Sequence, residues 1–176
     1  MDDKTQERIE ALEVALNNEE REKEFYLKNA ERTGNSLGKS MFRTIASDED
    51  EHYQRILELK ERLQKDGQWP DTLPLKIKET EIKSVLKKFV DSVDTSQKAD
   101  ASDIEAVKIA IDFETAGEAF YNRLRDSTAN PQEKAFFEML AKMENEHRLS
   151  LQDTYEYFID PEGWYRLKEG HHLDGA

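Results

Sequence analysis

The sequence predicts an all-α protein, a bundle of four long helices arranged as two hairpins. Two observations predict it. Apolar residues recur at the spacing of one helix face along four long segments, and the two halves of the chain repeat one another. The chain has 176 residues, which is the size of one domain, and its charged fraction of 37% suits helices with wide solvent-facing sides.

Turn residues bound the predicted hairpins, which span about residues 4–65 and 102–159. Gly34 breaks the first hairpin, and Asn35 can cap the helix that follows. In the second hairpin Asn130 supplies the cap, and Pro131 takes the first helical position, where a proline is tolerated. Pro161 is expected to end the last helix, so we predict one domain over residues 1–160 and an irregular C-terminal tail over 161–176.

Residues 66–101 form a long crossover between the hairpins. Gly67 ends the second helix, while Pro70 and Pro74 forbid continuous helix beyond it. Apolar residues then recur at helical spacing, which predicts a short amphipathic helix inside the crossover. These residues are Ile82, Val85, Leu86, Phe89 and Val93.

The repeat is gapless at an offset of 95 residues, as when Glu10 is laid on Glu105 and Phe25 on Phe120. Two similar hairpins can pack about a pseudo-two-fold axis into a four-helix bundle. A bundle of this kind with a single long crossover has the ferritin-like topology.

Polar residues interrupt each apolar line at matching places. Glu49 and His52 are three residues apart, so they are neighbours on one helix face. Glu19 lies about as far before the Gly34–Asn35 turn as Glu49 lies after it, and antiparallel packing therefore brings them to one height. The repeat doubles this set, and the six residues predicted to meet in the core are Glu19, Glu49, His52, Glu114, Glu144 and His147.

Four buried carboxylates would repel one another and lose their hydration at a cost of several kcal/mol each. Two divalent metal ions remove that cost, because their charge of +4 balances the four carboxylates. Oxygen and imidazole ligands suit iron or manganese, and Glu paired with Glu-x-x-His is the ligand pattern of di-iron bundles. The sequence therefore predicts two iron ions, with manganese as a possible occupant.

Three further residues are candidates for roles around this site. Tyr26 and Tyr121 occupy matching positions, and each is either a core tyrosine or a donor to a ligand carboxylate. Glu22 lies one turn after Glu19 on the same face. It is either a partly solvated glutamate or a seventh carboxylate that moves onto a metal during turnover. Its counterpart in the repeat is Gly117, so this feature is asymmetric.

Composition excludes several classes of site and partner. A formal net charge of −13 argues against nucleic acid, whose phosphates require clustered lysine and arginine. The absence of cysteine excludes disulfides, thiolate zinc sites and iron–sulfur clusters. The polar N-terminus and the lack of a long apolar run predict no signal peptide, no membrane span and a cytoplasmic location.

Over about residues 4–160 the sequence resembles the rubrerythrin family in its di-iron domain. Glu19 with Tyr26 and Glu49–His52 carry the resemblance, together with their second copies. It implies a non-haem di-iron site that reduces hydrogen peroxide, commonly in a homodimer. By the same resemblance Glu19 and Glu114 are terminal carboxylates, Glu49 and Glu144 bridge the metals, and His52 and His147 are the imidazole ligands.

The chain departs from that family in two ways. It has no cysteine and hence no cysteine-ligated rubredoxin domain, so electrons must come from an external donor protein or a small reductant. The mobile glutamate of the family is expected at Gly117, and Glu22 occupies the symmetric place instead. Hydrogen peroxide or dioxygen is thus the expected small-molecule substrate. The alternatives are a ferroxidase or iron-handling protein, a non-enzymatic metal-binding module and a dimanganese catalase.

Overall fold

The computed structural model describes residues 3–70, 80–85, 88 and 99–173. Within these ranges the elements are helices, and the two predicted hairpins are confirmed. The helices are α1 (Asp3–Arg32), α2 (Ser36–Asp66), α4 (Ala101–Ser127), α5 (Pro131–Ile159) and α6 (Pro161–Leu173).

The helix ends follow from local chemistry. Asn35 caps α2, and its side chain accepts a hydrogen bond from the backbone N–H of Gly38. Asn130 caps α5 in the same way, with Pro131 at the first helical position. Gly67 ends α2 with φ of 67°, a left-handed conformation that glycine adopts without strain. Asp100 and Asp103 form a reciprocal capping box at the start of α4 that the sequence analysis did not predict.

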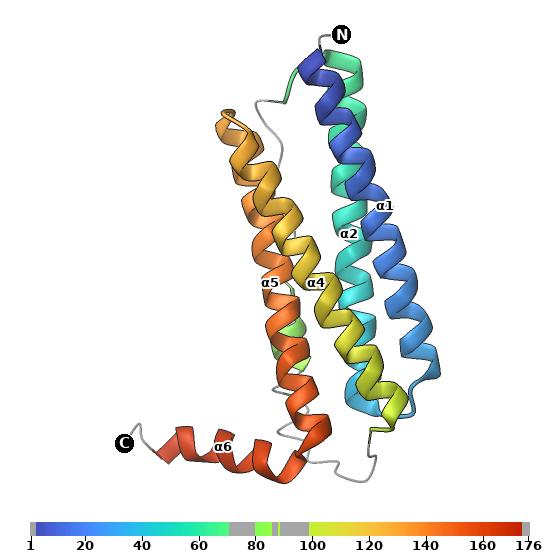
Figure 1. The fold of residues 1–176 in the computed structure, drawn as a ribbon, viewed down its shortest axis with the longest axis vertical. Helices are drawn as coiled ribbons and strands as arrows, with labels where there is room; N and C mark the ends of the chain where they lie inside the picture. Colours follow the sequence, from blue (N-terminus) through green and yellow to red (C-terminus); the bar gives the residue numbers. More distant parts are fainter. Residues whose placement is uncertain (1–2, 71–79, 86–87, 89–98, 174–176) are drawn as a thin grey trace.

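The bundle pairs α1 with α2 and α4 with α5 as antiparallel hairpins (Figure 1). Backbones approach most closely within each hairpin, whereas α1–α4 and α2–α5 meet across a wider separation. Long side chains fill that separation, and this is where the candidate site lies. The chain thus has the ferritin-like four-helix architecture that the sequence predicts.

Two apolar clusters stabilise the bundle, one on each side of its middle. One gathers around Leu12, Leu63 and Phe137 near the α4–α5 turn. The other gathers around Phe42 and Leu151 near the opposite end. The polar site separates the two clusters, so its residues lie between well-packed layers that exclude water.

Two outcomes concern the segments outside the hairpins. Residues 82–85 form a helical turn, and the side chain of Ile82 is fully buried in the second cluster. The rest of the predicted crossover helix, including Leu86, Phe89 and Val93, lies outside the described residues. The prediction of an irregular C-terminal tail is wrong, because helix α6 begins at Pro161 and projects sideways from the bundle (Figure 1).

The reason for that error lies in two residues. Pro161 cannot continue α5, but a proline fits the first turn of a new helix. Trp164 then packs its buried ring against Tyr157 at a centroid distance of 5.5 Å, and its indole N–H donates to Asp153. These contacts attach the base of α6 to α5.

Candidate metal centre

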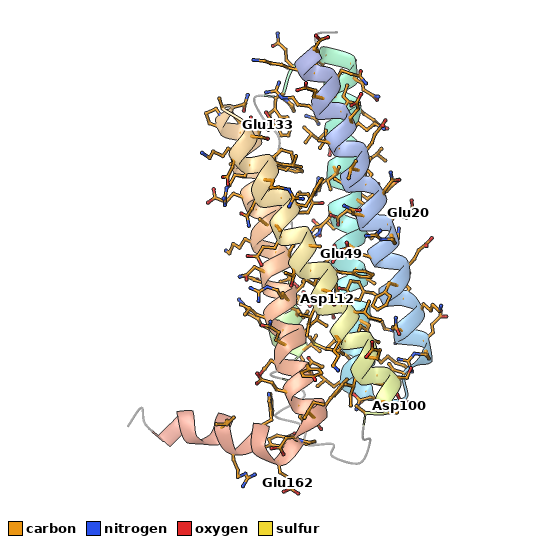
Figure 2. The ribbon with its side chains drawn as sticks, in the orientation of Figure 1. Glu20, Glu49, Asp100, Asp112, Glu133 and Glu162 are labelled. Carbon is orange, nitrogen blue, oxygen red and sulfur yellow. The ribbon has the colours of Figure 1, made fainter. Side chains whose placement is uncertain are left out.

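The structure brings the six predicted residues together halfway along the bundle. All four long helices contribute, and every one of the six side chains is buried. Figure 2 shows Glu49 inside the bundle near the middle of its length, while Glu20 lies on the outer side of α1. The six residues of the site are Glu19 on α1, Glu49 and His52 on α2, Glu114 on α4, and Glu144 and His147 on α5.

The six residues form two overlapping groups, each able to hold one metal ion. In each group the four possible ligand atoms lie within 4.8 Å of one another. Glu49 and Glu144 belong to both groups, whereas every other member belongs to only one. The first group is Glu19, Glu49, His52 and Glu144, and the second is Glu49, Glu114, Glu144 and His147.

Both imidazole rings present the same nitrogen to the carboxylates. Nδ1 of His52 lies 2.9 Å from an oxygen of Glu49 and 3.2 Å from one of Glu19. Nδ1 of His147 lies 3.2 Å from Glu49 and 3.4 Å from Glu114. The rings are stacked with centroids 6.0 Å apart. Each half therefore directs one Nδ1 toward the space between the carboxylates, where it can bind a metal once it has lost its proton.

Several ligand atoms in this space have no hydrogen-bond partner among the described residues. They include one oxygen each of Glu49 and Glu114, both oxygens of Glu144, and Nδ1 of His147, which approaches Glu49 and Glu114 without the geometry of a hydrogen bond. Buried polar atoms are rarely left unpaired, because desolvation costs them about 1–3 kcal/mol each. Carboxylate oxygens and imidazole nitrogens facing one another fit a pair of divalent cations.

Electrostatics in the metal-free chain shows how poorly protein groups alone balance this charge. Burial raises the pKa of Glu19 to about 7 and raises the pKa of Glu144 as well. Burial opposes charge on His52 too, but the Glu49 and Glu19 carboxylates overcome it and raise its pKa to about 10. The two imidazolium groups in turn hold the pKa of Glu49 below its usual range, in spite of its burial. Without metal, protons must neutralise part of the site.

The two tyrosines connect the hairpins. The Tyr26 hydroxyl on α1 donates to Glu114 on α4, and the Tyr121 hydroxyl on α4 donates to Glu19 on α1. Burial raises the pKa of both tyrosines, with neighbouring carboxylates adding to the effect, so both hydroxyls remain donors. Each phenol thereby fixes one oxygen of a candidate ligand and leaves the other oxygen facing the site.

Glu22 is buried beside the site but belongs to neither group. Its side chain is 5% exposed, on the same face of α1 as Glu19. Burial, together with the charges of Glu49 and Glu114, raises its pKa to about 9. At the matching position, a methyl group added to Gly117 would lie 3.4 Å from the Glu144 carboxyl. The glycine thus leaves space for no more than a small side chain against that carboxylate.

Sequence reasoning missed Asp48. Its carboxylate on α2 lies 3.0 Å from Nε2 of His147 on α5 and also accepts from the Thr80 hydroxyl. Asp48 directly precedes Glu49, but its counterpart in the repeat is Met143, so the repeat draws no attention to it. Only the packing of one hairpin on the other reveals its partner.

Comparison with known proteins then decides the family. The family model described as Rubrerythrin matches residues 10–155, which is most of the chain. The chain belongs to the rubrerythrin family. Rubrerythrin domains hold a di-iron centre, and the two buried groups of this chain fit that cofactor. The comparisons with curated proteins and with solved structures gave no significant match.

The rubrerythrin match, over residues 10–155, includes the site-bearing part of each of the four long helices. It leaves out α6, which begins after the matched range. Among the helices that the structure describes, none combines the length and apolar character that crossing a lipid bilayer requires.

Proposed function

We propose that this chain is a di-iron oxidoreductase that reduces hydrogen peroxide with electrons from an external donor. The observation that carries the proposal is the pair of overlapping ligand groups that share Glu49 and Glu144. Two metals held by common carboxylates are close enough to act on one small molecule together. The family match supports the same chemistry.

The proposed ligand roles follow from membership of the groups. Glu49 and Glu144 would be the ligands shared by both metals, since each belongs to both groups. Glu19 and His52 complete one position, and Glu114 and His147 complete the other. Tyr26 and Tyr121 hold the terminal carboxylates Glu114 and Glu19 by hydrogen bonds that cross between the hairpins.

The electron balance of the reaction requires two reducing equivalents. When bound, the ferrous pair supplies two electrons, and hydrogen peroxide with two protons becomes two water molecules. Glu22 is a candidate source of one proton, because burial raises its pKa to about 9 in the metal-free chain and keeps it protonated at neutral pH. After proton transfer its carboxylate could bind the more highly charged oxidised metal. The apolar clusters on both sides exclude competing water.

An external electron donor is part of the proposal. The chain contains no cysteine, so its own residues cannot form a cysteine-ligated iron site that would re-reduce the centre. A cytoplasmic location and a homodimer remain predictions; light scattering of the purified protein tests the latter.

The test is anaerobic metal analysis followed by rapid mixing of the reduced protein with hydrogen peroxide. We expect two iron ions per chain and oxidation of two ferrous ions per peroxide, with no dioxygen released. Tightly bound iron that peroxide fails to oxidise would contradict the proposal.

The same samples separate the alternatives. Fast oxidation by dioxygen with release of ferric iron would indicate an iron-handling ferroxidase. Native manganese with evolution of dioxygen from peroxide would indicate a catalase. Metal that stays redox-silent with every donor tried would indicate a binding module. Each outcome replaces peroxide reduction as the function.

A further inference from the structure

The two histidines of the centre differ on the side that faces away from the carboxylates. Nε2 of His147 lies 3.0 Å from Oδ2 of Asp48. The Asp48 oxygen is the acceptor in this contact, so Nε2 carries a proton, and once the ring has lost its second proton Nδ1 offers its lone pair to a metal. The Thr80 hydroxyl donates to the same oxygen of Asp48. His147 is thus held in one orientation and one tautomer by a fixed acceptor.

His52 has no such support. Its Nε2 is buried and has no hydrogen-bond partner among the residues that the structure describes. The position equivalent to Asp48 is Met143, a buried apolar residue that offers no strong acceptor. The two halves otherwise match in their candidate ligands and tyrosines, so they differ in whether the histidine Nε2 has an acceptor.

The acceptor bears directly on metal affinity. An imidazole that binds a cation through Nδ1 must carry its proton on Nε2. A carboxylate accepting that proton orients the ring and makes the ligand more basic, and its loss typically costs about 10- to 100-fold in metal affinity. Without an acceptor, metal binding leaves a buried N–H unsatisfied.

We propose that Asp48 is a positioning residue for His147 and that it makes the two metal positions unequal. The position between Glu114 and His147 fills first, and the one between Glu19 and His52 fills second and exchanges faster. This inference rests on the di-metal site of the proposed function. It assigns different properties to two positions that the ligand pattern alone makes equivalent.

The test is an anaerobic titration of the metal-free protein with Co²⁺, followed by visible absorption and calorimetry. Wild type is expected to bind two ions in separate steps, with dissociation constants about 10- to 100-fold apart. Asp48→Met makes the first hairpin match the second, so the tighter step should weaken until the two steps merge. Asp48→Asn keeps an acceptor oxygen and should retain part of the separation.

Two further variants make the test specific. Asp50→Met lies on the same helix and removes the same charge, but Asp50 is an exposed partner of Lys23 and should leave both steps unchanged. Met143→Asp places an acceptor on the side of His52 and should tighten the second step. Circular dichroism of each metal-free variant verifies that it is folded.

An independent readout is the histidine N–H spectrum of Zn²⁺-loaded protein labelled with ¹⁵N. One slowly exchanging Nε2–H is expected from His147, and it should disappear in Asp48→Met. Two equal steps in wild type, or unchanged steps in Asp48→Met, would overturn the inference and leave the proposed function standing. Failure of wild type to bind two ions would overturn both.

Discussion

The first and second hairpins present the same candidate metal-binding residues but differ in the residues that surround them. Glu19, Glu49 and His52 are matched by a second set at a constant offset. In the repeat, the position equivalent to Asp48 is a methionine, and the position equivalent to Glu22 is a glycine. The ligands thus follow the pseudo-two-fold symmetry, whereas the residues that support or could supplement them break it. The comparison separates the residues that could hold two metals from the residues that make the surroundings of the two positions unequal.

Removing the metals tests what both hairpins share, and it should have the largest effect. Without cations the buried carboxylates must bind protons or repel, and a ligand at about 1,000 times its dissociation constant stabilises the native state by about 4 kcal/mol. For a chain of this size that corresponds to a fall in melting temperature of about 10 °C on chelation. Scanning calorimetry of metal-free and reconstituted protein measures it. Coincident melting curves would contradict a metal centre that stabilises the fold.

Deleting a shared ligand should cost more than deleting an unshared one. Glu144 belongs to both groups, so Glu144→Ala should lower the metal content from two ions per chain to well below one. His147 belongs to one group, so His147→Ala should leave about one ion. Metal analysis after gel filtration measures both. Full occupancy in Glu144→Ala would remove that residue from the ligand set.

Glu22 marks the first asymmetry, and its deletion should affect rate more than occupancy. Glu22→Ala should keep two irons, because all six residues of the ligand groups remain. The peroxide-dependent oxidation of the reduced protein should slow by at least about tenfold, since positioned proton donors commonly contribute that much or more. Stopped-flow mixing of matched reduced samples measures the rate. Unchanged kinetics would mean that Glu22 only fills space beside the site.

The same residue predicts a pH dependence that its counterpart Gly117, which has no ionisable group, cannot contribute. In the metal-free fold burial raises the pKa of Glu22 from 4.5 to about 9, so the folded chain holds a proton that the unfolded chain releases. Its stabilising contribution is therefore complete below about pH 4.5 and is lost as the pH rises through 9. Glu22→Gln cannot ionise. The melting temperature of this metal-free variant should thus exceed that of wild type by a margin that grows from pH 5 to pH 9. A constant margin would contradict the raised pKa.

The smallest effect is expected at Gly117, the counterpart of Glu22. Alanine in a helix interior is favoured over glycine by up to about 1 kcal/mol. An added methyl would lie 3.4 Å from the Glu144 carboxyl, so Glu144 need shift little. Gly117→Ala should raise the melting temperature by about 2–4 °C with unchanged metal content. A loss of metal would mean that the glycine is required for the position of Glu144.

Much of the fold was accessible from local patterns. Helical periodicity and the turn residues Gly34, Asn35 and Asn130 predicted the hairpins, since caps and breaks depend on chemistry within a few residues. The segment after Pro161 was predicted to be irregular, but it forms a second helix that begins at this proline. Whether such a segment is ordered depends on partners such as Tyr157, against which Trp164 packs.

The sequence by itself determined which residues lie on the buried faces and at which height, because the repeat and the helix period specify both. It could not determine which individual side chains form hydrogen bonds between the two hairpins. The bonds from Tyr26 to Glu114, from Tyr121 to Glu19 and from His147 to Asp48 join residues about 90 to 100 positions apart. Those partners depend on the rotation and separation of the packed hairpins, which are set by the shapes of the apolar clusters on both sides of the site. Tertiary packing therefore decided that Asp48, whose counterpart in the repeat is Met143, contacts His147 of the other hairpin.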